Sequence, residues 1–200
     1  MPSLFKRIFA RLPMARSTSA YAFALEHVEI PANARVLDIG AGQGYGAAFL
    51  SRSLPGAQVF SVDVSMECLK PQRLETGPRP PIFIQASATH LPLAADSLEA
   101  VFAVMTFHCL PEPQRVVQEA ARVLKPGGVF ILADVDGRHW MKRPFEIVEH
   151  LFISPLTHAY TSDELRMLAG RAGLEAFRVE RRPGKEKGFM MWVFARKPVH

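Results

Sequence analysis

The run from Val36 to Gly46, VLDIGAGQGYG, most constrains this chain because it joins an apolar strand directly to a glycine-rich turn. Apolar residues flank Asp38, and glycines then recur at every second position from Gly40 to Gly46. Glycine has no Cβ and tolerates positive φ, so such a turn can bend sharply and press backbone groups against a ligand. The run therefore predicts a nucleotide-like ligand at the end of a strand.

Composition restricts the remaining classes. Two hundred residues suit one domain, and the apolar stretches are shorter than the roughly 18 residues of a membrane-spanning helix. Cys68 and Cys109 are the only cysteines, which argues against a disulfide framework and a zinc site and favours a cytoplasmic location. The net charge of +5 comes from basic residues near both ends, while the central body is mildly acidic. We therefore expect no nucleic-acid partner.

Residues 4–12 form an amphipathic basic segment, with apolar side chains at helical spacing and three basic residues elsewhere. Three interpretations stay open: peripheral contact with an anionic membrane surface, a lid over an apolar substrate, or a helix packed on its own domain. An acid-poor start that contains Arg and Ser also suits an organelle transit peptide.

The rest of the chain alternates helix and strand patterns, as one α/β domain does. The predicted helices are Ser19–His27, Gly46–Ser53, one opening at Ser65, Pro113–Val123 and Ser162–Ala172. The predicted strands are Arg35–Asp38, Gln58–Asp63, Ile82–Gln85, Leu98–Val104, Val129–Ala133 and a closing antiparallel pair, Glu175–Glu180 with Phe189–Arg196.

An acid ends the second predicted strand. Asp63 follows Gly44 by nineteen positions, and its carboxylate can accept hydrogen bonds from both hydroxyls of a ribose. The alternative is an Asp that caps the helix opening at Ser65. Glycine loop and ribose acid together indicate an adenosine-containing ligand.

A dinucleotide would also suit these residues, because Gly42 to Ala47 satisfies GxGxxA. Two features oppose it. The Asp38 carboxylate would repel a pyrophosphate but attract an ammonium group, and the turn Leu124–Gly128, LKPGG, has no place in the dinucleotide fingerprint.

In these motifs the chain resembles the class I S-adenosylmethionine-dependent methyltransferases of the small-molecule type. The matching pieces, in the family's order, are Val36–Gly46, Val59–Asp63, Ala86–Leu93, Ala100–Leu110 and Arg122–Leu132. The resemblance implies a doubly wound, mostly parallel seven-stranded Rossmann-like sheet of order 3-2-1-4-5-7-6 whose last hairpin is antiparallel. It implies one domain over 1–200, with an N-terminal lid or surface segment (1–27), a cofactor-binding core (34–135) and an acceptor cover with the closing hairpin (136–200).

The resemblance also implies S-adenosyl-L-methionine as cofactor and S-adenosyl-L-homocysteine as product. The residues expected to hold the cofactor are Asp38, Gly40, Ala41, Gly42 and Gly44 at the methionine end, Asp63 at the ribose, Val64, Met66, Ser87 and Ala88 around the adenine, and Val104 and Met105 near the sulfonium. Ser87 stands where relatives often carry an Asp, and a hydroxyl is a weaker acceptor for the adenine amine.

Methyl transfer from a sulfonium mainly requires alignment and exclusion of water, and a general base is optional. The candidates for such a base are His108, Asp134 and His139, which follow predicted strands. We expect no metal, because His139, His150 and His158 are irregularly spaced.

Aromatic residues between positions 136 and 160 favour a small apolar or aromatic acceptor that is quinone-, lipid- or polyketide-like. An alternative reading of this segment is that Phe145, Val148, Leu151 and Phe152 form the core face of a helix on the sheet. A nicotinamide-dependent oxidoreductase and a catalytically silent cofactor-binding module are the alternative functions.

Overall fold

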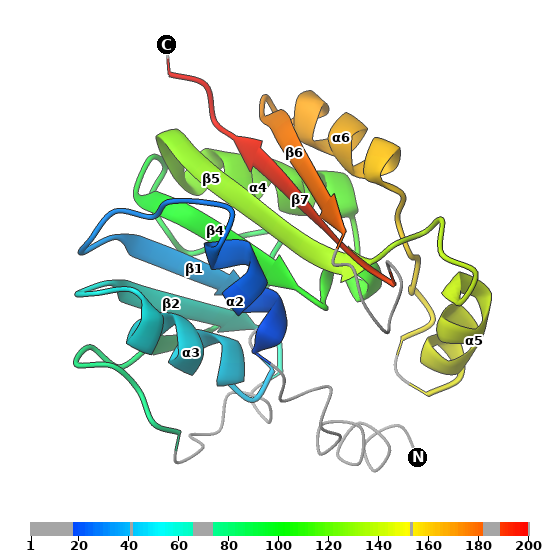
Figure 1. Ribbon diagram of the computed structural model, residues 1–200, viewed down its shortest axis with the longest axis horizontal. Coiled ribbons are helices and arrows are strands. Elements are labelled where there is room, and N and C mark those ends of the chain that lie inside the picture. The colour runs from blue at the N-terminus through cyan, green and yellow to red at the C-terminus, as the bar shows by residue number, and fades with distance from the viewer. Residues whose placement is uncertain (1–17, 41, 66–73, 153, 182–188, 200) are drawn as a thin grey trace.

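The computed structural model describes residues 18–40, 42–65, 74–152, 154–181 and 189–199. In these ranges seven strands form one sheet that helices flank on both faces (Figure 1). The helices are α2 (Ser19–Leu25), α3 (Tyr45–Ser53), the 3-10 turn η2 (Phe107–Cys109), α4 (Pro113–Val123), α5 (Lys142–Phe152) and α6 (Ser162–Arg171). The strands are β1 (Arg35–Ile39), β2 (Gln58–Asp63), β3 (Ile82–Gln85), β4 (Leu98–Val104), β5 (Leu124–Val135), β6 (Glu175–Arg181) and β7 (Met190–Arg196).

The sheet order is β3-β2-β1-β4-β5-β7-β6, as predicted. The first five strands pair in parallel, and β7 pairs antiparallel with both β5 and β6. β1, β4 and β5 are buried over nearly their whole length, which is why they read in the sequence as almost continuous apolar runs.

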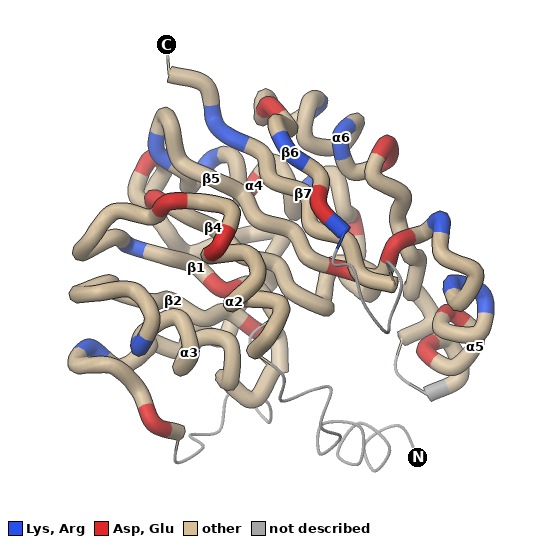
Figure 2. Tube along the Cα trace, in the orientation of Figure 1, with Lys and Arg blue, Asp and Glu red and all other residues tan. Residues whose placement is uncertain are grey.

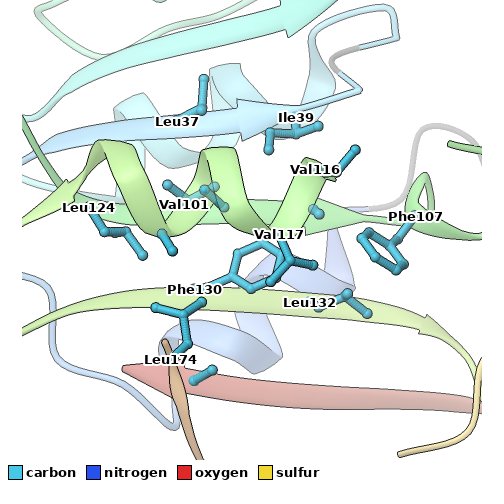
Figure 3. Close-up of a cluster of buried hydrophobic side chains, with 14 of the residues drawn as sticks. Leu37, Ile39, Val101, Phe107, Val116, Val117, Leu124, Phe130, Leu132 and Leu174 are labelled. Carbon is cyan, nitrogen blue, oxygen red and sulfur yellow. The ribbon is translucent and has the colours of Figure 1, made fainter. Parts of the chain in front are cut away.

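Alternate residues of the central strands point to opposite faces of the sheet. Leu37 and Ile39 belong to the cluster packed under α4 and α6 (Figure 3). Val36 belongs to the second cluster, which α2 and α3 cover on the other face. Asp38 lies between Leu37 and Ile39, so its side chain is directed to the α2 and α3 face.

The largest change from a predicted boundary is in β5. β5 begins at Leu124, five residues earlier than expected, because LKPGG continues the strand instead of forming a separate turn. Leu98 pairs with Leu124 and Ala100 with Val129, so the extra residues form a bulge in β5. Gly127 adopts φ +81° in that bulge. The helix expected to open at Ser65 lies almost entirely outside the described residues.

α5 stands apart from the sheet, beyond the carboxyl ends of β4 and β5 (Figure 1). The expectation that Val148 and Leu151 form a core face is wrong, because both side chains are exposed. Phe145 is partly buried, and the side chain of Phe152 lies outside the described part of the chain. Within the described ranges, no helix combines the length and apolar character needed to cross a membrane.

Candidate functional site

The turn after β1 is built on left-handed glycines. Gly40, Gly42 and Gly44 adopt φ of +75°, +49° and +81°, and α3 begins directly after them at Tyr45. A Cβ on Gly40 would lie 2.0 Å from Oγ1 of Thr106, so the turn passes too close to the β4 exit for any side chain. The result is a partly buried backbone turn at the amino end of a helix, with Gly42 open on the side where a Cβ would stand, which suits a close ligand. Ala41 lies outside the described residues.

Asp38 lies fully buried beside this turn. Its Oδ1 accepts a 2.8 Å hydrogen bond from the Tyr21 hydroxyl, while its Oδ2 has no hydrogen-bond partner among the described residues. Burial raises the pKa of Asp38 from 3.8 to about 7; the Tyr21 hydrogen bond opposes the rise, and the negative charge of Asp63 adds to it. A buried carboxylate oxygen without a hydrogen-bond partner favours a cationic hydrogen-bond donor as its ligand.

Tyr21 is a site residue that the sequence reading missed. A Cβ on Gly46 would lie 2.2 Å from the Tyr21 hydroxyl, so the fourth glycine of the run lets this side chain pass over the start of α3 to Asp38. Burial and the nearby Asp38 raise the pKa of Tyr21 well above 10.0. The phenol therefore stays protonated and donates a hydrogen bond to Asp38. The signal available in the sequence was the Tyr21 hydroxyl on a helix, α2, that is otherwise mostly apolar.

Asp63 ends β2 next to the glycine turn. Its Oδ2 accepts a 3.0 Å hydrogen bond from the Gly42 amide, and its Oδ1 accepts a 2.8 Å bond from the Ser65 amide. The bond from the Ser65 amide is the kind expected if Asp63 caps a helix that opens at Ser65, which was the alternative role of this residue. Each carboxylate oxygen can accept a second bond, so the orientation is compatible with a diol as well.

The segment expected around the adenine is fixed by α4. The Ser87 hydroxyl bonds the Thr89 hydroxyl at 2.8 Å and accepts the Thr89 amide at 3.2 Å. Glu119 accepts the Leu91 amide at 2.8 Å, and Arg122 donates to the Leu91 carbonyl at 2.9 Å. Ala88 is buried in this loop and Val64 is exposed at the end of β2, whereas Met66 lies outside the described residues.

The exit of β4 carries backbone strain. Val104 is buried, and Met105 adopts φ +50°, which costs a non-glycine residue on the order of 1–3 kcal/mol. The Met105 amide donates to the Ala133 carbonyl at 2.8 Å, so pairing with β5 holds the strained residue in place. The chain therefore turns sharply at the edge where the candidate ligand residues gather.

His108 and Asp134 come together as one buried pair. His108 Nδ1 lies 2.7 Å from Asp134 Oδ1, and the His108 amide donates to Asp134 Oδ2 at 2.9 Å. Glu149 of α5, which the sequence reading missed, places its buried Oε2 3.7 Å from His108 Nε2. Burial lowers the pKa of His108, but Asp134 and then Glu149 outweigh burial and hold that pKa well above 6.5. Both carboxylates therefore favour the protonated imidazole over the neutral one.

The other histidines have separate surroundings. His139 Nδ1 accepts the Met141 amide at 3.2 Å, and its ring meets Phe189 edge-on, with ring centres 5.4 Å apart. His150 Nε2 bonds the Thr157 carbonyl at 2.7 Å, and His158 Nε2 lies 3.3 Å from Glu164. His139 thus does not join the buried His108 pair in any described contact.

Comparisons with known proteins agree with this geometry. Residues 37–132 match the model of a family described as a methyltransferase domain. The methyltransferase GfsG of Streptomyces halstedii is 36% identical over 116 residues, covering 55% of this chain and 41% of that protein. A phthiotriol/phenolphthiotriol dimycocerosates methyltransferase of Mycobacterium ulcerans is 34% identical over 110 residues, covering 54% and 40%. The matches thus span about two fifths of these relatives' length.

The whole described fold is also found in a solved structure. A SAM-dependent methyltransferase from Thermotoga maritima superimposes with a TM-score of 0.77 at 22% identity, covering 98% of this chain and 100% of that one. Four observations lead to the same assignment: the sheet order, the glycine turn, the buried Asp38 and the matched family model. The family match over residues 37–132, the curated relatives and the shared fold support a class I S-adenosylmethionine-dependent methyltransferase.

Proposed function

We propose that this chain transfers the methyl group of S-adenosylmethionine to a small apolar or aromatic acceptor that is quinone-, lipid- or polyketide-like. The observation that carries the proposal is the unpartnered Oδ2 of the fully buried Asp38 beside the left-handed glycine turn. The α-ammonium group of the cofactor's methionine part would give that oxygen the cationic partner it lacks. The open space at Gly42, where a Cβ would meet no atom closer than 4.0 Å, supports close approach of the same part.

The other cofactor contacts follow the order of the strands along the sheet edge. Asp63 would hold the ribose hydroxyls, and Val64, Ser87 and Ala88 would surround the adenine. Val104 and Met105, at the β4 exit, would lie near the sulfonium. The proposed roles of Ala41 and Met66 concern residues outside the described ranges.

S-adenosylmethionine, when bound, supplies a methyl group already activated by the sulfonium charge. The task of the chain is then to align the acceptor with that methyl group and to exclude water, which in the best-oriented systems contributes on the order of 7–11 kcal/mol. The strained turn at Met105 and the buried edge around Thr106 and Phe107 support a rigid, dry wall for this purpose.

His108 with Asp134 is the proposed acid–base pair. Because the His108 pKa is raised, the ring removes a proton from an acceptor only after losing its own, so base-dependent methylation of a hydroxyl or carbon should accelerate with rising pH. Asp134 accepts two hydrogen bonds from His108 and one from the Val135 amide, which suits a positioning role. His139 is the weaker candidate because it lies in the aromatic group with Phe189.

The acceptor class rests on the surroundings of His108 and on the relatives. The Phe145 ring meets the His108 ring edge-on at 5.1 Å between centres, and Phe145 continues to Phe189 at 6.1 Å. The Mycobacterium ulcerans relative is named as a methyltransferase of phthiotriol and phenolphthiotriol dimycocerosates. We also propose that residues 4–12, which lie outside the described residues, contact a membrane peripherally. The cytoplasmic location stays a prediction.

Calorimetric titration with S-adenosylhomocysteine and separately with NAD tests the cofactor. Binding of NAD alone would overturn the proposal in favour of a nicotinamide enzyme. Transfer of a tritiated methyl group to a panel of quinols, hydroxylated lipids and aromatic polyketides then tests the activity. A protein that binds S-adenosylhomocysteine tightly but labels none of them would be the silent binding module.

A further inference from the structure

The apolar face of the amphipathic helix α5 is exposed instead of packed on the core. Four exposed apolar residues share one face of α5 at positions i, i+3, i+4 and i+7, and an exposed Trp140 lies in the turn just before the helix. The residues on the face are Pro144, Ile147, Val148 and Leu151. We call these four residues together with Trp140 the outer stripe. Trp140 is 77% exposed, Ile147 57% and Leu151 70%. A stripe of this kind on a helix of a folded domain normally faces the core.

Polar contacts hold α5 in this orientation. On its inward face Glu149 is buried next to His108, with 3.7 Å between Oε2 and Nε2. Glu146 accepts the Ala159 amide at 2.9 Å and lies 3.8 Å from Lys142 Nζ. Rotating the helix to bury the outer stripe would break these contacts and expose the carboxylates. The fold therefore presents the apolar face outward as a fixed feature.

The residues around the outer stripe suit a lipid surface. Figure 2 shows basic residues in the first turn of α5, and of these Arg143 is exposed and precedes Ile147 by one helical turn, whereas Lys142 pairs with Glu146. Trp140, the large aromatic of the stripe, precedes this turn. A tryptophan, an aliphatic stripe and a flanking arginine are features of a helix that lies in the plane of a membrane interface. The exposed Arg143 favours an anionic surface over a neutral one.

We propose that α5 docks on an anionic lipid bilayer through the outer stripe, with Trp140, Ile147 and Leu151 inserted among the headgroups. This surface is distinct from the membrane contact proposed for residues 4–12, and it does not depend on methyl transfer. Because the opposite face of α5 contacts His108, docking would bring the bilayer next to the acceptor side of the site. An apolar acceptor would then reach the site without crossing water.

Sedimentation of the full chain with vesicles tests the surface. The vesicles are phosphatidylcholine with about one third phosphatidylglycerol, compared with phosphatidylcholine alone. The variant Ile147→Ser/Leu151→Ser should lose tenfold or more of its partition into anionic vesicles, because two inserted side chains are lost. The matched control is Met167→Ser/Phe177→Ser, at apolar positions 51% and 47% exposed on α6 and β6, which should stay within about twofold of the parent. Both variants should retain S-adenosylhomocysteine binding, which separates this test from that of the function.

Trp140 fluorescence locates the contact. Anionic vesicles should shift its emission to the blue, and brominated lipid should quench it. In Trp140→Phe the remaining Trp192, 2% exposed, should give neither effect. Pelleting without a Trp140 shift would overturn the proposal and assign binding to another surface, such as residues 4–12. If the parent chain is a dimer that dissociates in Ile147→Ser/Leu151→Ser, a second copy of the chain covers the outer stripe. If deleting residues 1–16 shifts the Trp140 emission to the red, that segment covers Trp140. Either result overturns the proposal.

Discussion

Cofactor affinity should depend on pH through Asp38. In the ligand-free protein the pKa of this carboxyl is about 7, chiefly because it is buried. An ammonium group next to the unpartnered Oδ2 would favour the ionised form, so binding must displace the proton from Asp38 wherever that proton is still present.

The magnitude follows from that pKa. About nine tenths of Asp38 is protonated at pH 6 and about a quarter at pH 7.5, so the affinity for S-adenosylhomocysteine should rise roughly eightfold between these values. Close to one proton should be released per bound ligand at pH 6 and about a quarter of a proton at pH 7.5. The same raised pKa means that Asp38 stabilises the ligand-free fold most below pH 3.8 and that this contribution is lost as the pH rises to about 7.

Calorimetry in two buffers with different ionisation enthalpies measures the affinity and the released protons together. Asp38→Asn, which has the same shape but no titration, should bind weakly with a flat profile over this range. Tyr21→Phe removes a hydrogen bond that lowers the Asp38 pKa, so the rise in affinity should move to higher pH. An equal affinity at pH 6 and pH 7.5, or a pH dependence unchanged in Asp38→Asn, would show that Asp38 does not lose a proton when the cofactor binds.

Three further predictions concern neighbouring residues. Asp63→Ala should weaken S-adenosylhomocysteine binding tenfold or more, or about 1.5–3 kcal/mol for charge-assisted hydrogen bonds; unchanged calorimetric affinity would place the ribose elsewhere. Gly40→Ala should destabilise the protein by about 2 kcal/mol or more in urea unfolding, because the new Cβ meets Thr106 at 2.0 Å and φ stays positive; a loss below 1 kcal/mol would show that the turn relaxes freely. Glu149→Gln should lower the His108 pKa in an NMR titration, since one of the carboxylates that raise it is gone; an unmoved pKa would mean that this carboxylate does not act on the ring.

Much of the fold could be predicted from the sequence because hydrophobic period and turn chemistry are local signals. Gln58–Asp63, Ile82–Gln85, Leu98–Val104 and Pro113–Val123 match the observed elements to the residue. The strand order came from the family resemblance, since residue patterns say little about which strands become neighbours. β5 exceeded its predicted length because a bulge with a left-handed Gly127 lets a strand continue through residues typical of a turn.

Asp38 and Asp63 could be proposed for the candidate site from the sequence because each stands at or next to the end of a strand. The partners that set its electrostatics could not be found in this way. Tyr21 reaches Asp38 from a different helix, and Glu149 reaches His108 from a segment beyond the sheet. Such contacts depend on how elements pack, and packing brings together residues whose separation in sequence carries no signal.

In α5 the contributions of the sequence and of tertiary packing can be told apart. The order of amino acids is enough to show that residues 140–151 carry apolar residues with helical period, because side chains three and four positions apart share a face. It does not show which way that face points, since the period is the same for an inward and an outward face. Packing of α5 fixes the direction, because burying Glu149 beside His108 leaves Ile147 and Leu151 on the outside.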